Sequence, residues 1–104
     1  MTQIKIYLSK IEQHRISLIS EINAIILRLI NEFGGLTVYQ ARGFWLNPKT
    51  RQLEIENGEV FEFFTKNTNM EDINAIVKAE CKKLKQLLNQ NCLLYTINYE
   101  PIMV

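Results

Sequence analysis

The chain has 104 residues, which is enough for one domain with a single core and too few for two. Twelve basic and eleven acidic residues leave a formal net charge of +1, so charge gives no reason to expect a nucleic acid partner. No secretory leader or unbroken apolar span is evident and no metal-ligand cluster appears, so we expect a cytoplasmic protein without membrane contact, metal or cofactor.

The first half of the chain predicts a strand and a long helix. Residues 3–8 alternate between apolar and polar, which is the pattern of a half-buried strand. Ser9-Lys10-Ile11-Glu12 has the form of a capping box, so a helix is expected to begin there and to end at Gly34, a residue that adopts left-handed backbone angles easily. The apolar residues expected to face a sheet are Leu18, Ile22, Ile25 or Ile26, Leu29, Ile30 and Phe33.

Two strands and a hairpin follow. The β-branched and aromatic run from Thr37 to about Trp45 predicts the second strand, and residues 53–64 predict the third. Asn47-Pro48-Lys49-Thr50 between them is typical of a turn. Asn57-Gly58 indicates either a bulge within the third strand or a second tight hairpin, and we favour the bulge because it keeps the sheet at four strands.

The last third of the chain predicts a second helix and a final strand. Thr68-Asn69-Met70-Glu71 is a second capping box, and the strand is expected from Cys92 to Tyr99, before Pro101 discourages further pairing. Both cysteines lie in apolar stretches and are expected to be buried, reduced thiols. The apolar stripe of this helix consists of Ile73, Val77, Cys81, Leu84 and Leu88.

The order strand, helix, strand, strand, helix, strand predicts one α+β domain over residues 1–104. We expect a ferredoxin-like βαββαβ fold, with a four-stranded antiparallel sheet and both helices on one face. Apolar residues point both ways on the third and last strands, so the open face is expected to be an interface. We expect a homodimer packed through that face, with edge-strand pairing into a ring as the alternative. The interface residues would be Tyr7, Val60, Phe64 and Leu94.

Short motifs along the chain resemble those of a known group of proteins. They are Gly34-Gly35-Leu36-Thr37, Gly43-Phe44-Trp45, Glu56 and Gln90. Together they resemble an uncharacterised family of small bacterial ferredoxin-like proteins. The resemblance implies the same fold and implies no activity.

Four residues form the candidate ligand site, namely Trp45, Glu56, Arg42 and Gly43. Gly43 is expected to allow a bulge or a close backbone approach, which would place the indole of Trp45 near Glu56 across the hairpin. A carboxylate beside an aromatic wall suits a polar ligand group. The alternative is that Trp45 closes one end of the core and Glu56 accepts its indole proton or faces solvent.

Catalytic residues at a recognisable spacing are absent from the sequence, so we expect a small self-associating binding or regulatory module. The first alternative is a small enzyme of the dimeric α+β barrel type, with Trp45, Glu56 and Arg42 lining its cavity. The second is an RNA-binding domain, because residues 6–11 and 57–64 are similar to the motifs of the RNA recognition fold. In that motif Glu59 replaces a stacking aromatic residue, which counts against RNA binding.

Overall fold

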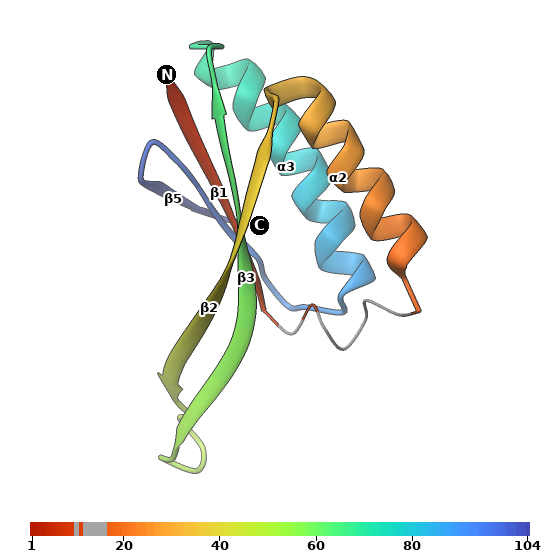
Figure 1. Ribbon diagram of the computed structural model, residues 1–104. Helices are drawn as coiled ribbons and strands as arrows, with labels where there is room; N and C mark the ends of the chain where they lie inside the picture. Colours follow the sequence, from red (N-terminus) through yellow and green to blue (C-terminus); the bar gives the residue numbers. More distant parts are fainter. Residues whose placement is uncertain (10, 12–16) are drawn as a thin grey trace.

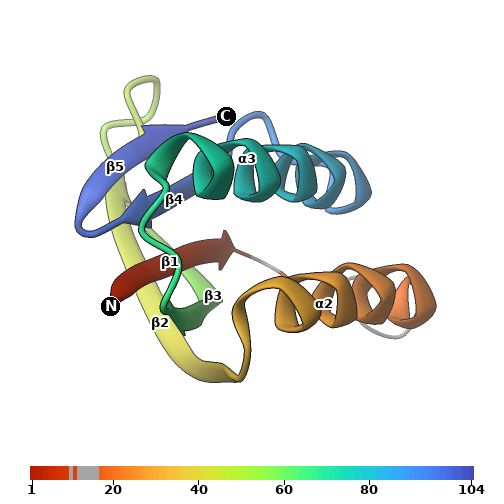
Figure 2. The ribbon, with the colours of Figure 1, turned by 90° about the horizontal axis from the view of Figure 1, so that it is seen from above.

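The computed structural model describes residues 1–9, 11 and 17–104. Two helices lie side by side on one face of an antiparallel sheet, so the predicted α+β class is confirmed (Figures 1 and 2). No helix among the described residues is long and apolar enough to cross a bilayer. The elements are β1 (Thr2–Ser9), α2 (Ile19–Phe33), β2 (Leu36–Leu46), β3 (Leu53–Thr65), α3 (Met70–Leu87), β4 (Leu94–Ile97) and β5 (Glu100–Met103).

The sheet has five strands in the order β2-β3-β1-β4-β5, so the predicted count of four is wrong. The extra strand arises because the predicted last strand turns back on itself at Asn98 and Tyr99, whose φ angles are +48° and +70°. Positive φ at both central residues is the geometry of a two-residue type I′ hairpin, whose twist matches that of the flanking strands. Residues 92–99 therefore contain β4 and the start of a hairpin, and β5 follows as an edge strand.

Pro101 does not prevent pairing, because it occupies a position of β5 that needs no backbone donor. Leu93 and Val104 exchange both backbone hydrogen bonds, at 3.2 and 3.0 Å. Hydrogen-bonded pairs alternate with non-bonded pairs along an antiparallel ladder, which places Pro101 opposite Thr96 in a non-bonded pair. The missing N–H of proline then points away from β4, as edge strands tolerate.

The predicted bulge at Asn57-Gly58 is also wrong. Pairing of β2 with β3 runs without a break from Leu36 opposite Phe63 to Leu46 opposite Leu53. Pairing of β1 with β3 is equally regular and ends with Ser9 opposite Gly58. The dipeptide therefore lies inside one continuous strand, and the alternative of a second hairpin at this position is excluded as well.

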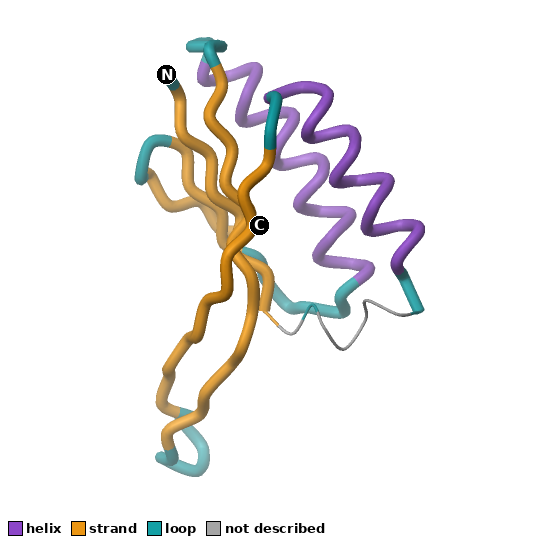
Figure 3. The backbone as a smooth tube through the Cα atoms, viewed as in Figure 1, coloured by secondary structure: helices purple, strands orange, loops and turns teal. Residues whose placement is uncertain are grey.

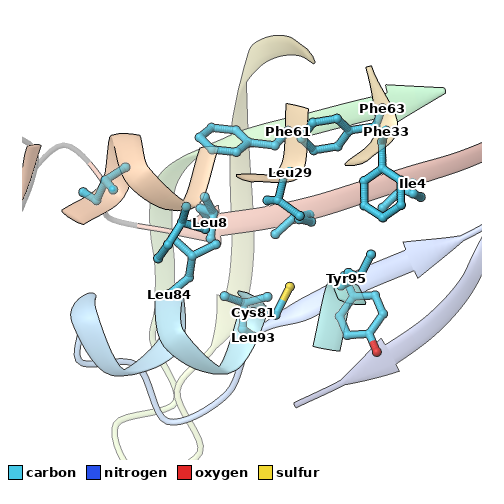
Figure 4. Close-up of a cluster of buried hydrophobic side chains, with 14 of the residues drawn as sticks. Ile4, Leu8, Leu29, Phe33, Phe61, Phe63, Cys81, Leu84, Leu93 and Tyr95 are labelled. Carbon is cyan, nitrogen blue, oxygen red and sulfur yellow. The ribbon is translucent and has the colours of Figure 1, made fainter. Parts of the chain in front are cut away.

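The core lies between the two helices and the sheet, as the close-up in Figure 4 shows. Helix α3 buries the whole stripe predicted from its sequence. Helix α2 buries Ile22, Ile25, Leu29 and Phe33, and the ring of Phe33 packs edge-on against Phe63 at 5.9 Å between centroids. From the sheet, Tyr95 is fully buried and its hydroxyl donates to Asn74 Oδ1 at 2.6 Å.

The helix ends agree only in part with the predicted capping boxes. Lys10 and Glu12 of the first box lie outside the described residues, and α2 is described from Ile19. Gly34 ends α2 with a φ of +95°, as predicted. At α3 the capping residue is Asn69 rather than Thr68, because the Asn69 side chain accepts the backbone N–H of Asp72.

The two cysteines differ in their environments. Cys81 is buried against the core, and burial together with the neighbouring charge of Glu80 raises the pKa of its thiol to about 12. Cys92 is exposed just before β4, which contradicts its predicted burial. Its position after α3 and outside the sheet ladder explains the difference.

Strands β2 and β3 continue past the helices as a projecting ribbon, seen at the bottom of Figures 1 and 3. Register places one row of apolar side chains on the same face as the core residues Phe61 and Phe63. Neither α2 nor α3 covers that row at the ribbon end, and each of its members is between 45% and 64% exposed. The row consists of Val38, Phe44, Leu46, Leu53 and Ile55.

Candidate functional site

The face of the sheet opposite the helices carries a hollow at the base of the ribbon. Directly opposed residues of an antiparallel pair point to the same face. Ser9 and Ala41 both oppose Gly58, and Gly43 opposes Glu56. Since Phe61 and Phe63 mark the helix-covered face, this set lies on the other, open face. Three neighbouring positions there, 41, 43 and 58, have no side chain larger than a methyl group.

A cavity of about 310 Å³ lies over these small residues. This volume falls within the range of about 300–1,000 Å³ that is usual for small-molecule sites. The cavity is open on one side, and most of the surface that lines it is apolar. It is lined by Tyr7, Leu8, Ser9, Ala41, Arg42, Gly43, Glu56, Gly58 and Glu59.

The structure brings together three of the four predicted ligand-site residues. Arg42, Gly43 and Glu56 line the cavity. Trp45 lies two residues beyond Gly43 on the same face, but it pairs with Glu54 and does not line the cavity. Its side chain is 42% exposed, so it does not close the core either. Gly43 sits in regular pairing, so the expected bulge is absent there.

Most of the remaining lining residues were not expected in the site. Tyr7 was assigned to an interface, Glu59 was considered only as a replaced aromatic residue, and Ser9, Ala41 and Gly58 were given no site role. The signal that could have found them is the pattern of small residues at alternating positions 41 and 43 in one strand, facing Gly58 in the next. That pattern predicts a depression on one sheet face.

Close packing of β1 against β3 holds the edge of the cavity. A Cβ atom added to Gly58 would lie 2.4 Å from the Leu8 carbonyl oxygen and 2.9 Å from the Ser9 Cα, so only glycine fits there. The end of β1 is held from the other side by Gln90, whose Nε2 donates to the Ser9 carbonyl oxygen. Gln90 therefore has a structural role beside the site.

The charged groups that line the cavity favour a cationic ligand. Glu56 lies opposite Gly43, so its half-buried carboxylate is on the open face. Arg42 and Glu59 alternate with these positions, and register directs their side chains toward the helix-covered face, where Glu59 is buried. The ring of Tyr7 adds an aromatic wall on the open face, and aromatic faces attract cations. The cavity thus offers a cationic group one carboxylate and one aromatic ring.

Farther along the open face, polar residues replace the apolar surface expected there. Lys5 and Glu62 form an ion pair at 3.7 Å, and Gln3 also donates to Glu62. Burial lowers the pKa of Lys5, but the bond to Tyr39 and nearby negative groups outweigh it and leave that pKa above its usual value. The predicted interface residues Tyr7, Val60, Phe64 and Leu94 do share this face. Val60 is already buried within the chain.

Solved structures of phage SAM lyase share this fold. The chain aligns over 99% of its length with a phage SAM lyase in complex with S-methyl-5'-thioadenosine, covering 88% of that chain with a TM-score of 0.69 and 17% identity. It aligns equally far with a phage SAM lyase in the apo state, covering 87% of that chain with a TM-score of 0.71 and 18% identity. No family model matches the sequence, and no curated protein matches it.

This likeness overturns the leading functional prediction. The chain was expected to be a binding or regulatory module, but its structural neighbours are enzymes, and the likeness extends over nearly the whole fold. The alternative of a small enzyme agrees better with these findings. The prediction failed because the cavity is built largely from small residues, which form no recognisable motif in the sequence.

Proposed function

We propose that this protein is a small enzyme that cleaves a sulfonium nucleoside of the S-adenosylmethionine type and releases S-methyl-5'-thioadenosine. The observation that supports the proposal most is the open-face cavity with the carboxylate of Glu56, on a fold shared with phage SAM lyase along 99% of the chain. We take the fold itself to be ferredoxin-like, with β5 added at one edge of the sheet.

The cavity offers partners for the cationic groups of such a substrate. The sulfonium centre and the ammonium group would lie toward Glu56 and the Tyr7 ring, which are both on the open face. Charge and hydrogen bonding of this kind fix the orientation of a ligand in a largely apolar site.

The reaction breaks the bond between sulfur and the amino-acid side chain. Both electrons of that bond stay on sulfur, which leaves as a neutral thioether. The carbon that loses sulfur forms a new bond to a carboxylate oxygen of the same amino-acid chain, so the fragment closes to a lactone and no second substrate is needed. The residues of the chain then have to orient the amino-acid fragment for this ring closure and pair its ammonium charge. We assign that role to Glu56, with Trp45 two residues beyond Gly43 on the same face.

The test is direct incubation of the purified protein with S-adenosylmethionine, followed by chromatography and mass detection of S-methyl-5'-thioadenosine. We expect release above the uncatalysed background. Glu56→Gln keeps size and hydrogen-bonding capacity but removes the charge, and should lower kcat/KM by about 10²-fold or more. Glu54→Gln is the matched control, because Glu54 lies on the same strand face but outside the cavity.

Two results would contradict the proposal. One is a rate equal to background for the wild-type chain at substrate concentrations well above 1 mM, the upper end of the usual KM range of about 1 μM–1 mM. The other is equal loss of activity in Glu56→Gln and Glu54→Gln, which would indicate a general effect of charge on the ribbon rather than a role for the cavity.

A further inference from the structure

Gly43 is a glycine that the fold does not require. It lies in the middle of β2, an eleven-residue strand, in unbroken pairing with β3. Its φ is not in the left-handed region, and a Cβ atom built on it would meet only the Glu56 carbonyl oxygen at 3.9 Å, an ordinary contact. Glycine within a strand lowers stability, because it loses more backbone freedom on folding and packs no side chain.

The other glycine of the cavity differs in this respect. A side chain on Gly58 would collide with β1, so packing alone explains that residue. Packing does not explain Gly43, although it too lines the cavity. Because Gly43 has no side chain, its backbone forms a flat surface that is continuous with Ala41. This surface lies between the ring of Tyr7 and the carboxylate of Glu56. Backbone left bare in this way allows a ligand to approach closely.

We infer that the surface formed by Ala41, Gly43 and Gly58 is the floor on which the planar base of a nucleoside lies. A flat ring can contact bare backbone over its whole face, whereas any side chain at position 43 would hold it away. The base stacks on this floor, and the Trp45 ring, two residues farther on the same face, stands at its edge. Glu56, directly across from Gly43, then lies beside the sugar and its substituent.

This inference rests on the proposed function for the identity of the nucleoside, but its test is a binding test. S-methyl-5'-thioadenosine and adenosine are titrated calorimetrically into the wild-type chain, Gly43→Ala, Gly43→Val and Gly35→Ala. Thermal unfolding of the four proteins is measured without ligand. Gly35→Ala is the matched control, because a Cβ there meets nothing within 4 Å and Gly35 lies outside the cavity.

We expect binding and stability to change in opposite directions at position 43. Gly43→Val should bind both nucleosides at least about tenfold more weakly, with Gly43→Ala in between, because the added carbons occupy the floor. The melting temperatures of both variants should equal or exceed that of the wild type. Gly35→Ala should bind as the wild type does. Quenching of Trp45, the one tryptophan of the chain, should accompany binding.

Several outcomes would overturn the inference. Gly43→Val that binds both nucleosides as tightly as the wild type would show that the floor is not the base site. A lowered melting temperature in both Gly43 variants would show that the fold does need glycine there. A wild-type chain that binds neither nucleoside would also exclude the floor.

Failure of this inference is distinguishable from failure of the proposed function. If Gly43→Val cleaves S-adenosylmethionine as the wild type does, the proposed function holds and the floor is not the base site. If the wild type binds nucleosides but cleaves no S-adenosylmethionine, and Gly43→Val loses that binding, the floor is supported and the proposed reaction is excluded.

Discussion

Asn69 and Thr68 show how one position in the chain decides where a helix starts. Both residues can cap a helix, and Thr68 is the one that fits the capping-box pattern. In the structure Asn69 takes the extended capping conformation and accepts the Asp72 N–H at 3.1 Å. Its own N–H donates to Asn67 Oδ1 at 2.9 Å, and the side chain of Asn67 donates to Asp72. The loop before α3 thus supports Asn69 as the cap.

Asn69→Ala is expected to destabilise the protein by about 1 kcal/mol, because the helix loses the side-chain acceptor for one of its free backbone donors. Thr68→Ala should change the free energy of unfolding by less than about 0.5 kcal/mol, as for a surface residue without a special contact. Chemical denaturation of the two variants measures both values. Equal destabilisation by the two substitutions, or a larger effect at Thr68, would contradict the assignment of the cap.

The pair of helices is joined across its outer side by an ion-pair cluster. Arg28 of α2 donates two hydrogen bonds to the Glu80 carboxylate of α3, at 3.0 and 2.9 Å, and Lys83 adds a third at 3.3 Å. Burial alone would raise the pKa of Glu80, but the bonds from Arg28 and Lys83 outweigh it and hold that pKa below the usual 4.5. The folded state therefore prefers Glu80 ionised.

This preference predicts a loss of stability in acid. A carboxyl group whose pKa is lower in the folded chain stabilises the fold above its unfolded pKa of 4.5, and the contribution disappears as the pH falls through the folded value. Glu80→Gln should therefore narrow the difference in unfolding free energy between pH 7 and pH values below about 4. Denaturation curves at several pH values test this, with Glu100→Gln on the exposed edge strand as control. An unchanged pH dependence in Glu80→Gln would contradict it.

At the scale of the whole molecule, the exposed apolar surface lies on a face of the ribbon that was not expected to be an interface. The row of Val38, Phe44, Leu46, Leu53 and Ile55 continues the core face of the sheet beyond the helices. Contiguous apolar surface of this kind usually marks an interface. The open face retains Tyr39, Trp45 and Phe64, which are between 40% and 49% exposed, but it also carries the Lys5–Glu62 pair. The expected homo-oligomer stays a prediction, and two surfaces now compete for it.

Light scattering during size-exclusion chromatography separates the two surfaces. We expect the wild-type chain to elute with a mass above 12.2 kDa at micromolar concentration. If the ribbon mediates assembly, Phe44→Lys should lower the mass toward one chain while Phe64→Lys leaves it unchanged, because a charge placed in an apolar contact must be desolvated. The reverse pattern would support the open face and the predicted dimer. A wild-type mass of one chain would exclude both.

Local periodicity was sufficient to predict both helices and four of the five strands from the sequence. The apolar stripe from Ile73 to Leu88 predicts the buried side of α3, and the alternation of residues predicts the buried side of β1. Both predictions were confirmed. These features depend on neighbours close in sequence, and so the pattern of residues is enough to show them. Glu56, Arg42 and Gly43 were selected differently, from short motifs and an expected bulge on the predicted hairpin, and their role in a site stays a prediction.

The cavity, the fifth strand and the exposed ribbon depended on contacts between distant segments. Gly58 has to be glycine only because β1 packs against it, and the hollow exists only because β2 places Ala41 and Gly43 beside it. Pro101 is compatible with a strand only in the particular register that β4 imposes. The packing of the whole core decides how strands pair and how much of the sheet a helix covers. A local sequence pattern does not contain this information.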